Sequence, residues 1–241
     1  MKTRLLVGTA LAVACFSAPA ISADMPKPLY KAPPAIDVWN PWMIRVRALG
    51  VLPNTSGSTV NVSGVATLST PYSGLSISNS TVPELDISYF FTRSVAAELI
   101  LGVTPHNITG TGAIAGLNVG KTWLLPPTLM FQYHFVDFGA FKPYVGIGAN
   151  YTAYFDQSAG NTVNNGVAIT SLSVKNSFGA AAQVGFDYML DRHWGLNFDV
   201  KKLYLEPGYT AVATAGVVNL PINGTANINP WLIGGGLTYK F

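Results

Sequence analysis

Charged residues are scarce in this chain: Asp, Glu, Lys and Arg together make up 10% of its 241 residues. An ordinary soluble domain has about 25% charged residues, so an ordinary water-facing surface does not fit this composition. The mean hydropathy of +0.32 points the same way. Long apolar runs are nevertheless absent after residue 23, which makes membrane-spanning helices of about 20 residues improbable. The apolar residues are therefore dispersed, as they are in alternating strands.

Cysteine is also scarce, because Cys15 is the only one in the chain. It lies in residues 1–23, which have the layout of a secretory signal peptide: a basic start, an apolar stretch over 5–16 and small residues before Ala23. We expect cleavage after Ala23, with cleavage after Ala20 as the alternative. The mature chain would then carry no disulfide or thiol chemistry. Lipid attachment at Cys15 is the competing interpretation, but the residues before it match a lipoprotein signal poorly.

An excess of charge of one sign is missing too. The full chain has 14 basic and 11 acidic residues, but Lys2 and Arg4 belong to the predicted signal peptide. Without these two, 12 basic residues stand against 11 acidic ones, a net charge of +1. Such a balance gives no support to nucleic acid as a partner.

Residues suited to enzyme chemistry are few and far apart. The three histidines, His106, His134 and His193, have no cysteine near them and no spacing typical of metal ligands. None has a serine two positions on, as in lipid A deacylases, and no Gly-x-Ser-x-Gly motif occurs. His134 could act as a base, but a structural hydrogen bond is the favoured role. The sequence therefore predicts no enzyme, no metal and no cofactor.

What the chain does have is a regular alternation of apolar and polar residues. Residues 24–41 contain five prolines and predict an extended, proline-rich periplasmic lead-in. From residue 42 onward the pattern has the period of two that is typical of strands. Eight segments alternate in this way: 42–49, 84–91, 95–103, 129–135, 141–155, 177–188, 193–201 and 231–241.

The connections between these segments alternate in length. Three are short, at 92–94, 136–140 and 191–192, and four are long and polar, at 52–80, 105–126, 157–175 and 206–227. Short periplasmic turns and long external loops are typical of barrels in the outer membrane of Gram-negative cells, with both termini periplasmic. The expected fold is all-β: an eight-stranded antiparallel up-and-down transmembrane β-barrel over residues 42–241.

Charge is confined to one face of the predicted strands. A soluble sandwich would turn that face to water, which leaves no purpose for the aromatic residues at the strand ends. A barrel in outer-membrane lipid turns its apolar face outward, places aromatic girdles at the interfaces and keeps polar groups in the lumen. The apolar face carries no charge, and the other face carries five cations and five anions: Arg45, Arg47, Lys142, Lys201, Lys240, Glu84, Asp86, Glu98, Asp187 and Asp199.

Several short motifs resemble the OmpW family of small outer-membrane proteins. They occur in family order at residues 42–47 (WMIRVR), 87–92 (ISYFFT), 97–99 (AEL), 125–129 (LPPTL), 132–135 (QYHF), 142–146 (KPYVG), 150–152 (NYT), 178–181 (FGAA), 183–188 (QVGFDY) and 230–231 (PW). The resemblance implies an eight-stranded barrel and passage of small hydrophobic molecules, and some members resemble bacteriocin receptors. The ending at Phe241 resembles the signal read by the outer-membrane assembly machinery. The lead-in at 24–41 departs from the short family N-terminus.

Inward polar residues near the short turns predict a plug in the periplasmic half of the lumen. Eight strands enclose room for side chains or for one small ligand, so a wide aqueous pore is excluded. Charges buried there must be paired. This network either only stabilises the barrel or also closes a path. Its candidate members are Arg45, Arg47, Asp86, Glu98, Gln132, His134, Lys142, Asp187, Asp199 and Lys240.

The outer half of the lumen has a different composition. Leu49 and Ile100 point inward there, and small residues either leave a pocket or make room for larger neighbours. The functional interpretation is an apolar lumen for hydrophobic solutes, which then leave sideways where prolines weaken strand pairing, at Pro53, Pro126, Pro127 and Pro230. The alternative is a structural barrel, or a receptor or adhesin, with a filled core. The candidate lumen residues are Leu49, Ile100, Gly146, Gly148, Gly234 and Gly236.

Overall fold

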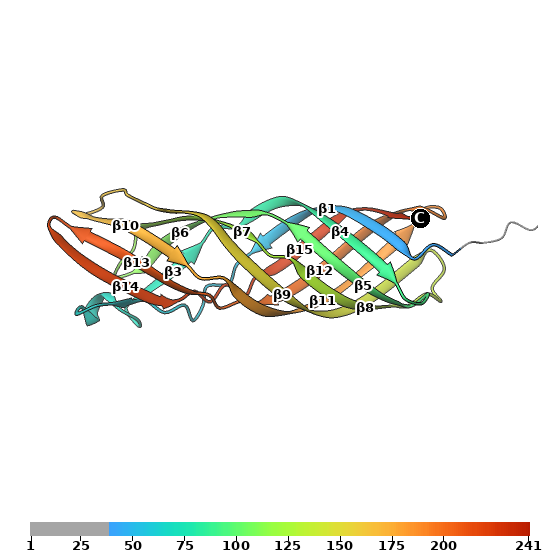
Figure 1. The fold of residues 1–241 in the computed structure, drawn as a ribbon, viewed down its shortest axis with the longest axis horizontal. Coiled ribbons are helices and arrows are strands. Elements are labelled where there is room, and N and C mark those ends of the chain that lie inside the picture. Colours follow the sequence, from blue (N-terminus) through green and yellow to red (C-terminus); the bar gives the residue numbers. More distant parts are fainter. Residues whose placement is uncertain (1–38) are drawn as a thin grey trace, which may run out of the picture. The chain divides into compact units, whose positions relative to one another are not determined.

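A computed structural model describes residues 39–241, so the predicted signal peptide and most of the lead-in lie outside the described residues. Eight strands form a closed antiparallel ring, in the order β1–β4–β5–β8–β9–β11–β12–β15 and back to β1 (Figure 1). This ring confirms the predicted all-β barrel. Its strands are β1 (Trp42–Leu52), β4 (Ser80–Phe90), β5 (Val95–Gly102), β8 (Thr128–His134), β9 (Phe141–Ala159), β11 (Ser177–Met189), β12 (Trp194–Tyr204) and β15 (Trp231–Lys240).

The period-two pattern of the sequence becomes the two faces of the wall. In β1 the side chain of Val46 is 57% exposed and points outward, whereas its neighbour Arg45 is 0% exposed and points into the lumen. The strand register places inward residues of neighbouring strands opposite one another: Arg47 lies opposite Glu84 in β4 and opposite Gly236 in β15. A slip of one residue would turn buried charges outward, so the two faces also fix the register.

Three short connections lie at one end of the ring, here called the turn end. The first and last residues of the barrel chain lie at the same end. The connections are residues 91–94, 135–140 and 190–193, close to the predicted turns. The backbone N–H of Phe241 donates to the carbonyl of Trp42 at 3.2 Å, which joins the first strand to the end of the last. Exposed aromatic side chains surround this end: Trp42, Tyr89, Phe91, Tyr133, Phe135, Phe141, Tyr188, Trp194 and Phe241.

The four segments predicted as long polar connections contain seven further strands and a short 3-10 helix, here called the extension. β3, β6 and β7 continue the barrel sheet from the outer half of β9, and β10, β13, β14 and β2 form a second sheet. No helix within residues 39–241 is long and apolar enough to span a membrane. The extension consists of β2 (Asn61–Val62), η1 (Ala66–Leu68), β3 (Ser73–Ile77), β6 (Thr104–Gly112), β7 (Asn118–Leu125), β10 (Val167–Val174), β13 (Gly208–Ala215) and β14 (Val218–Thr225).

The outer face of the extension is polar, whereas the outer face of the ring is apolar. In β6 and β7, Ile108 and Val119 are buried inside, whereas Asn107, Thr109 and Lys121 are exposed outside. Hydroxyl and amide side chains tolerate this position in strands, and the apolar ones pack against the facing sheet. The extension therefore has an outer surface suited to water and an apolar core that continues the lumen of the ring.

Candidate functional site

Arg45 is the centre of the charged layer nearest the turn end. Its guanidinium binds Asp187 in bidentate fashion, with Nε donating to Oδ1 at 3.0 Å and Nη2 to Oδ2 at 2.6 Å. Its Nη1 also pairs with Glu98, which accepts a further hydrogen bond from Ser88. All of these groups are buried. Two carboxylates from strands on opposite sides of β1 thus enclose one cation.

Arg47 is the centre of a second charged layer, which lies next to the first on the side away from the turn end. It lies 2.6 Å from Glu84, 2.5 Å from Asp86 and 2.7 Å from Asp199. Lys201 adds a second cation, at 2.8 Å from Glu84 and 3.2 Å from Asp199. Because every partner is buried, each charge depends on its neighbours in place of water.

Amide side chains connect the two layers and fill the remaining cross-section. Gln183 donates to Asp199 at 2.5 Å, and Gln132 donates to Glu98 at 2.6 Å and to Gln183 at 2.9 Å. His134 lies 3.0 Å from the amide oxygen of Gln132. Together with the charged layers these side chains form the polar network. The network crosses the lumen as a continuous hydrogen-bonded layer.

Eight of the ten candidate plug residues meet in this network, and two do not. Lys142 donates to the carbonyl of Val136, and Lys240 lies over the ring of Phe90 with its Nζ 4.9 Å from the centroid. Both lysines are only half-buried and lie near the turn end. The candidate set omitted Glu84 and Lys201, which carry inward charge in the sequence pattern. It also omitted uncharged inward residues such as Gln183 and Asn197, whose amide oxygen accepts from Arg47 at 2.9 Å.

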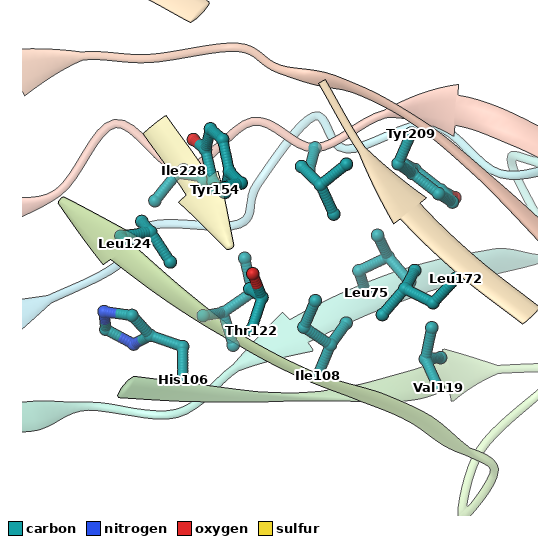
Figure 2. Close-up of a pocket in the computed structure, with 13 residues that line it drawn as sticks. Leu75, His106, Ile108, Val119, Thr122, Leu124, Tyr154, Leu172, Tyr209 and Ile228 are labelled. Atoms are coloured by element: carbon teal, nitrogen blue, oxygen red, sulfur yellow. The ribbon is translucent and has the colours of Figure 1, made fainter. Parts of the chain in front are cut away.

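Above the polar network the lumen becomes apolar. The lower cavity rests on Glu84 and Lys201 and is walled by Leu49, Val51, Ile100, Leu203, Leu205 and Leu232. The middle cavity, shown in Figure 2, is walled by Leu75, Ile108, Val119, Leu124, Leu172 and Val174. The upper cavity lies inside the extension, among Val60, Val62, Leu117, Ile169, Ala211 and Ile222.

These three cavities are neighbours along one apolar column. His106, Leu124 and Ile228 line both the lower and the middle cavity. Leu75 and Tyr209 are shared in the same way by the middle and upper cavities. Each cavity holds only a few molecules of the size of water in this conformation, so a larger guest requires side chains to move.

The candidate lumen residues divide between the column and the network. Leu49 and Ile100 line the lower cavity, but the four glycines do not line any of the three cavities. A Cβ on Gly234 would lie 2.8 Å from Asp199 Oδ1, and one on Gly148 would lie 2.6 Å from the sulfur of Met130.

The other two glycines are equally close to larger neighbours. A Cβ on Gly146 would lie 3.2 Å from Gln132 Cγ, and one on Gly236 would lie 2.6 Å from Arg47 Cα. The expectation that these glycines leave an apolar space is therefore corrected. They make room for the backbone and large side chains of the neighbouring strands.

The wall of the lower cavity contains a break in strand pairing. The β5–β8 ladder ends at Ile100 and Thr128, and the β6–β7 ladder begins at Thr104 and Leu124, so residues 101–103 have no partner in 125–127. Pro126 and Pro127 have no N–H to donate there. Gly102 and Pro126 both line the cavity beside this break.

The other two predicted prolines lie in a wall that stays hydrogen-bonded. Next to Pro53, the N–H of Asn54 donates to Ile228 at 2.8 Å, and the carbonyl of Pro230 accepts from Leu203 at 3.2 Å. The proline effect on strand pairing is thus concentrated at residues 126–127. Over residues 39–241, no three His, Cys, Asp or Glu side chains gather as ligands for a metal ion.

A closed ring of eight antiparallel strands, with a mainly apolar outer face and its buried charges in the lumen, defines an outer-membrane β-barrel embedded in lipid. The chain belongs to the OmpW family, whose profile matches residues 41–241. It is 52% identical over 235 residues to the uncharacterized outer-membrane protein y4mB of Sinorhizobium fredii, covering 96% of this chain and 94% of that protein.

Similarity extends to further relatives in Gram-negative bacteria. Outer membrane protein W of Vibrio cholerae is 37% identical over 207 residues, which cover 83% of this chain and 88% of that protein. The crystal structure of OprG from Pseudomonas aeruginosa has a TM-score of 0.71 and 26% identity, covering 83% of this chain and 95% of that chain. These relatives confirm the family that the sequence motifs suggested.

Proposed function

We propose that this barrel admits small hydrophobic molecules into its narrow apolar lumen and releases them sideways into the bilayer. The observation that carries the proposal is the apolar column, three adjoining cavities that end on the polar network. A hydrophobic molecule gains free energy on leaving water for such a column, at about 25 cal/mol per Å² of apolar surface buried. Hydrated ions lose their water there without compensation.

The polar network supports a sideways release over an axial one. A solute that continued along the axis would have to separate Arg47 from Glu84, Asp86 and Asp199. Breaking a buried ion pair costs about 3–5 kcal/mol. The break beside residues 126–127 needs no ladder hydrogen bonds to be broken, and it adjoins the lower cavity directly above the network.

The two ends of the barrel support an orientation in the membrane. Short turns are typical of the periplasmic side and long connections of the external side. We therefore place the turn end, with both barrel termini, in the periplasm and the extension outside the cell. In this orientation the upper cavity is the part of the column nearest the external medium.

Two terminal segments have roles in export in this proposal. Residues 1–23 are the signal peptide, and the last strand together with Phe241, which follows it, is recognised by the assembly machinery. Phe241 is 47% exposed at the turn end, so its side chain is accessible in the folded barrel.

Uptake of radiolabelled naphthalene by Gram-negative cells expressing the chain tests the route. Leu49→Asp places a carboxylate in the lower cavity and should reduce uptake at least several-fold, because that charge must be solvated in the column. Thr109→Asp is the matched control, since Thr109 is exposed on the outside of β6. Heat-dependent gel mobility verifies that each barrel is folded.

A second variant tests the exit. Pro126→Ala with Pro127→Ala restores two backbone N–H donors beside residues 101–103, and should lower uptake by completing the strand pairing. Uptake that is unchanged in Leu49→Asp would refute the lumenal route and favour the structural or receptor barrel. If uptake falls in Leu49→Asp but not in the proline variant, release at this break is refuted and the lumenal route still stands.

A further inference from the structure

His106 is a polar side chain placed within the apolar column. It lies on β6 opposite Thr122 on β7, and its side chain points inward. It is 4% exposed and lines both the lower and the middle cavity, so it marks their junction. Figure 2 shows the ring at the edge of the middle cavity, with Leu124 and Thr122 as labelled neighbours. Any solute that moves between the two cavities passes this ring.

The hydrogen bond of His106 fixes which nitrogen carries the proton. Nδ1 lies 2.7 Å from the backbone carbonyl of Ser78, and a carbonyl oxygen only accepts, so Nδ1 is the donor. Burial lowers the pKa of His106 below its ordinary value, which keeps the ring neutral at pH 7. In a neutral ring with Nδ1 protonated, Nε2 carries a lone pair and acts only as an acceptor.

The hydrogen bond of the ring to the described residues is made through Nδ1, which leaves Nε2 available to a ligand. The nearby Thr122 hydroxyl lies 3.4 Å from two carbonyl oxygens, those of Trp123 and Phe155. Lys201, the cation on the floor of the lower cavity, is already paired with Glu84 and Asp199. The ring thus presents an acceptor at the junction of the two cavities, and the hydroxyl of Tyr154 is a second polar group without a partner in the lining of the middle cavity.

We propose that His106 Nε2 binds the hydroxyl or N–H group of hydrophobic solutes and so favours amphiphilic solutes with one donor over pure hydrocarbons. The inference rests on the proposed route through the column and specifies which solutes it takes. A solute with a donor forms a hydrogen bond at the junction while its apolar body stays among the leucine and valine side chains. A hydrocarbon of the same size leaves Nε2 without a partner.

The size of the preference follows from the hydrogen bond. A solute hydroxyl or N–H group adds a hydrogen bond that the matched hydrocarbon does not make, and we expect about a tenfold difference between matched solutes, equivalent to about 1.4 kcal/mol. Naphthalene and 2-naphthol are a suitable pair because they differ by one hydroxyl group and both fluoresce. The full mature barrel in lipid nanodiscs is titrated with each, after subtraction of partitioning into empty nanodiscs.

Nitrogen-15 NMR of histidine-labelled protein gives a direct readout, since the chain has only three histidines. The Nε2 resonance of His106 should move on addition of 2-naphthol and stay in place with naphthalene. His106→Phe should abolish the preference without weakening naphthalene binding, and His106→Gln, which keeps an acceptor, should retain part of it. His193→Gln, at the turn end, is the control and should leave both affinities unchanged.

The outcomes separate this inference from the route itself. Equal affinities for both probes, or an Nε2 resonance that does not respond to bound 2-naphthol, would overturn the role of His106 and leave the route intact. If neither probe binds and Leu49→Asp does not change uptake, both proposals fail. The wild-type NMR experiment decides the matter even if a variant does not fold.

Discussion

Removal of Arg47 is expected to destabilise the barrel because it leaves one buried carboxylate of the polar network without a cation. In Arg47→Met, Glu84 and Asp199 keep Lys201 as a cation, at 2.8 and 3.2 Å. Asp86 keeps no ion-pair partner among the described residues, because Arg47 at 2.5 Å is the one cation within reach. A buried charge left unpaired costs about 3–5 kcal/mol.

Urea unfolding of the barrel in lipid vesicles, followed by tryptophan fluorescence, measures this cost. With a slope of about 2 kcal/mol per molar urea, the midpoint should fall by about 1.5–2.5 M. Arg47→Met combined with Asp86→Leu also removes the carboxylate that the single variant leaves unpaired, and should recover most of the lost stability. Val46→Met, on the outward face of the same strand, is the control and should leave the midpoint in place.

Two results would refute this reasoning. One is a folded Arg47→Met barrel whose midpoint lies within about 0.5 M of the wild type, which is smaller than any shift expected from an unpaired buried charge. The other is a double variant no more stable than the single one, which would mean that Asp86 is not the source of the loss.

Two further predictions concern a packed glycine and a titrating turn. Gly234→Ala should destabilise the barrel by about 1–3 kcal/mol, because its Cβ would lie 2.8 Å from a carboxylate oxygen, whereas Gly235→Ala, with its nearest atoms at 3.9 Å, should be neutral in the same urea assay. Two backbone N–H groups lower the pKa of Asp191 at the turn end, so its stabilising effect is present above its unfolded value of about 3.9 and is lost on acidification. Asp191→Asn should therefore reduce stability at pH 7, and this loss should shrink as the pH falls through the lowered pKa of Asp191; a loss that does not change with acidification would contradict it.

The eight ring strands were predictable because lipid and lumen impose a strong contrast on alternate residues. Val46 beside Arg47 is unambiguous, since only one of the two tolerates the hydrocarbon. The strands of the extension were not predicted, because residues such as Thr210 and Ala211 alternate between exposed and buried with little difference in hydropathy. Strands rich in Thr, Ser, Asn and Gly have the composition of loops, so composition alone does not distinguish the two.

The interior was predictable in kind but not in detail. Inward charge had to be paired, but the pairing of Arg45 with both Glu98 and Asp187 depends on the stagger of the barrel, which no local pattern records. The glycines illustrate the same limit. Whether Gly234 leaves a space depends on its cross-strand neighbours, and Asp199 in β12 occupies that space.

The length of β9 has a consequence for where a solute leaves water. Its 19 residues extend about 60 Å along the strand, or roughly 45–50 Å along the barrel axis at a tilt near 40°. The apolar band of an outer-membrane barrel is about 25 Å tall, so about 20 Å of the wall stands clear of the hydrocarbon. In the proposed orientation and route, a guest dehydrated at the far end of the extension would cross the polysaccharide layer of the cell surface inside the protein, without contact with its sugars.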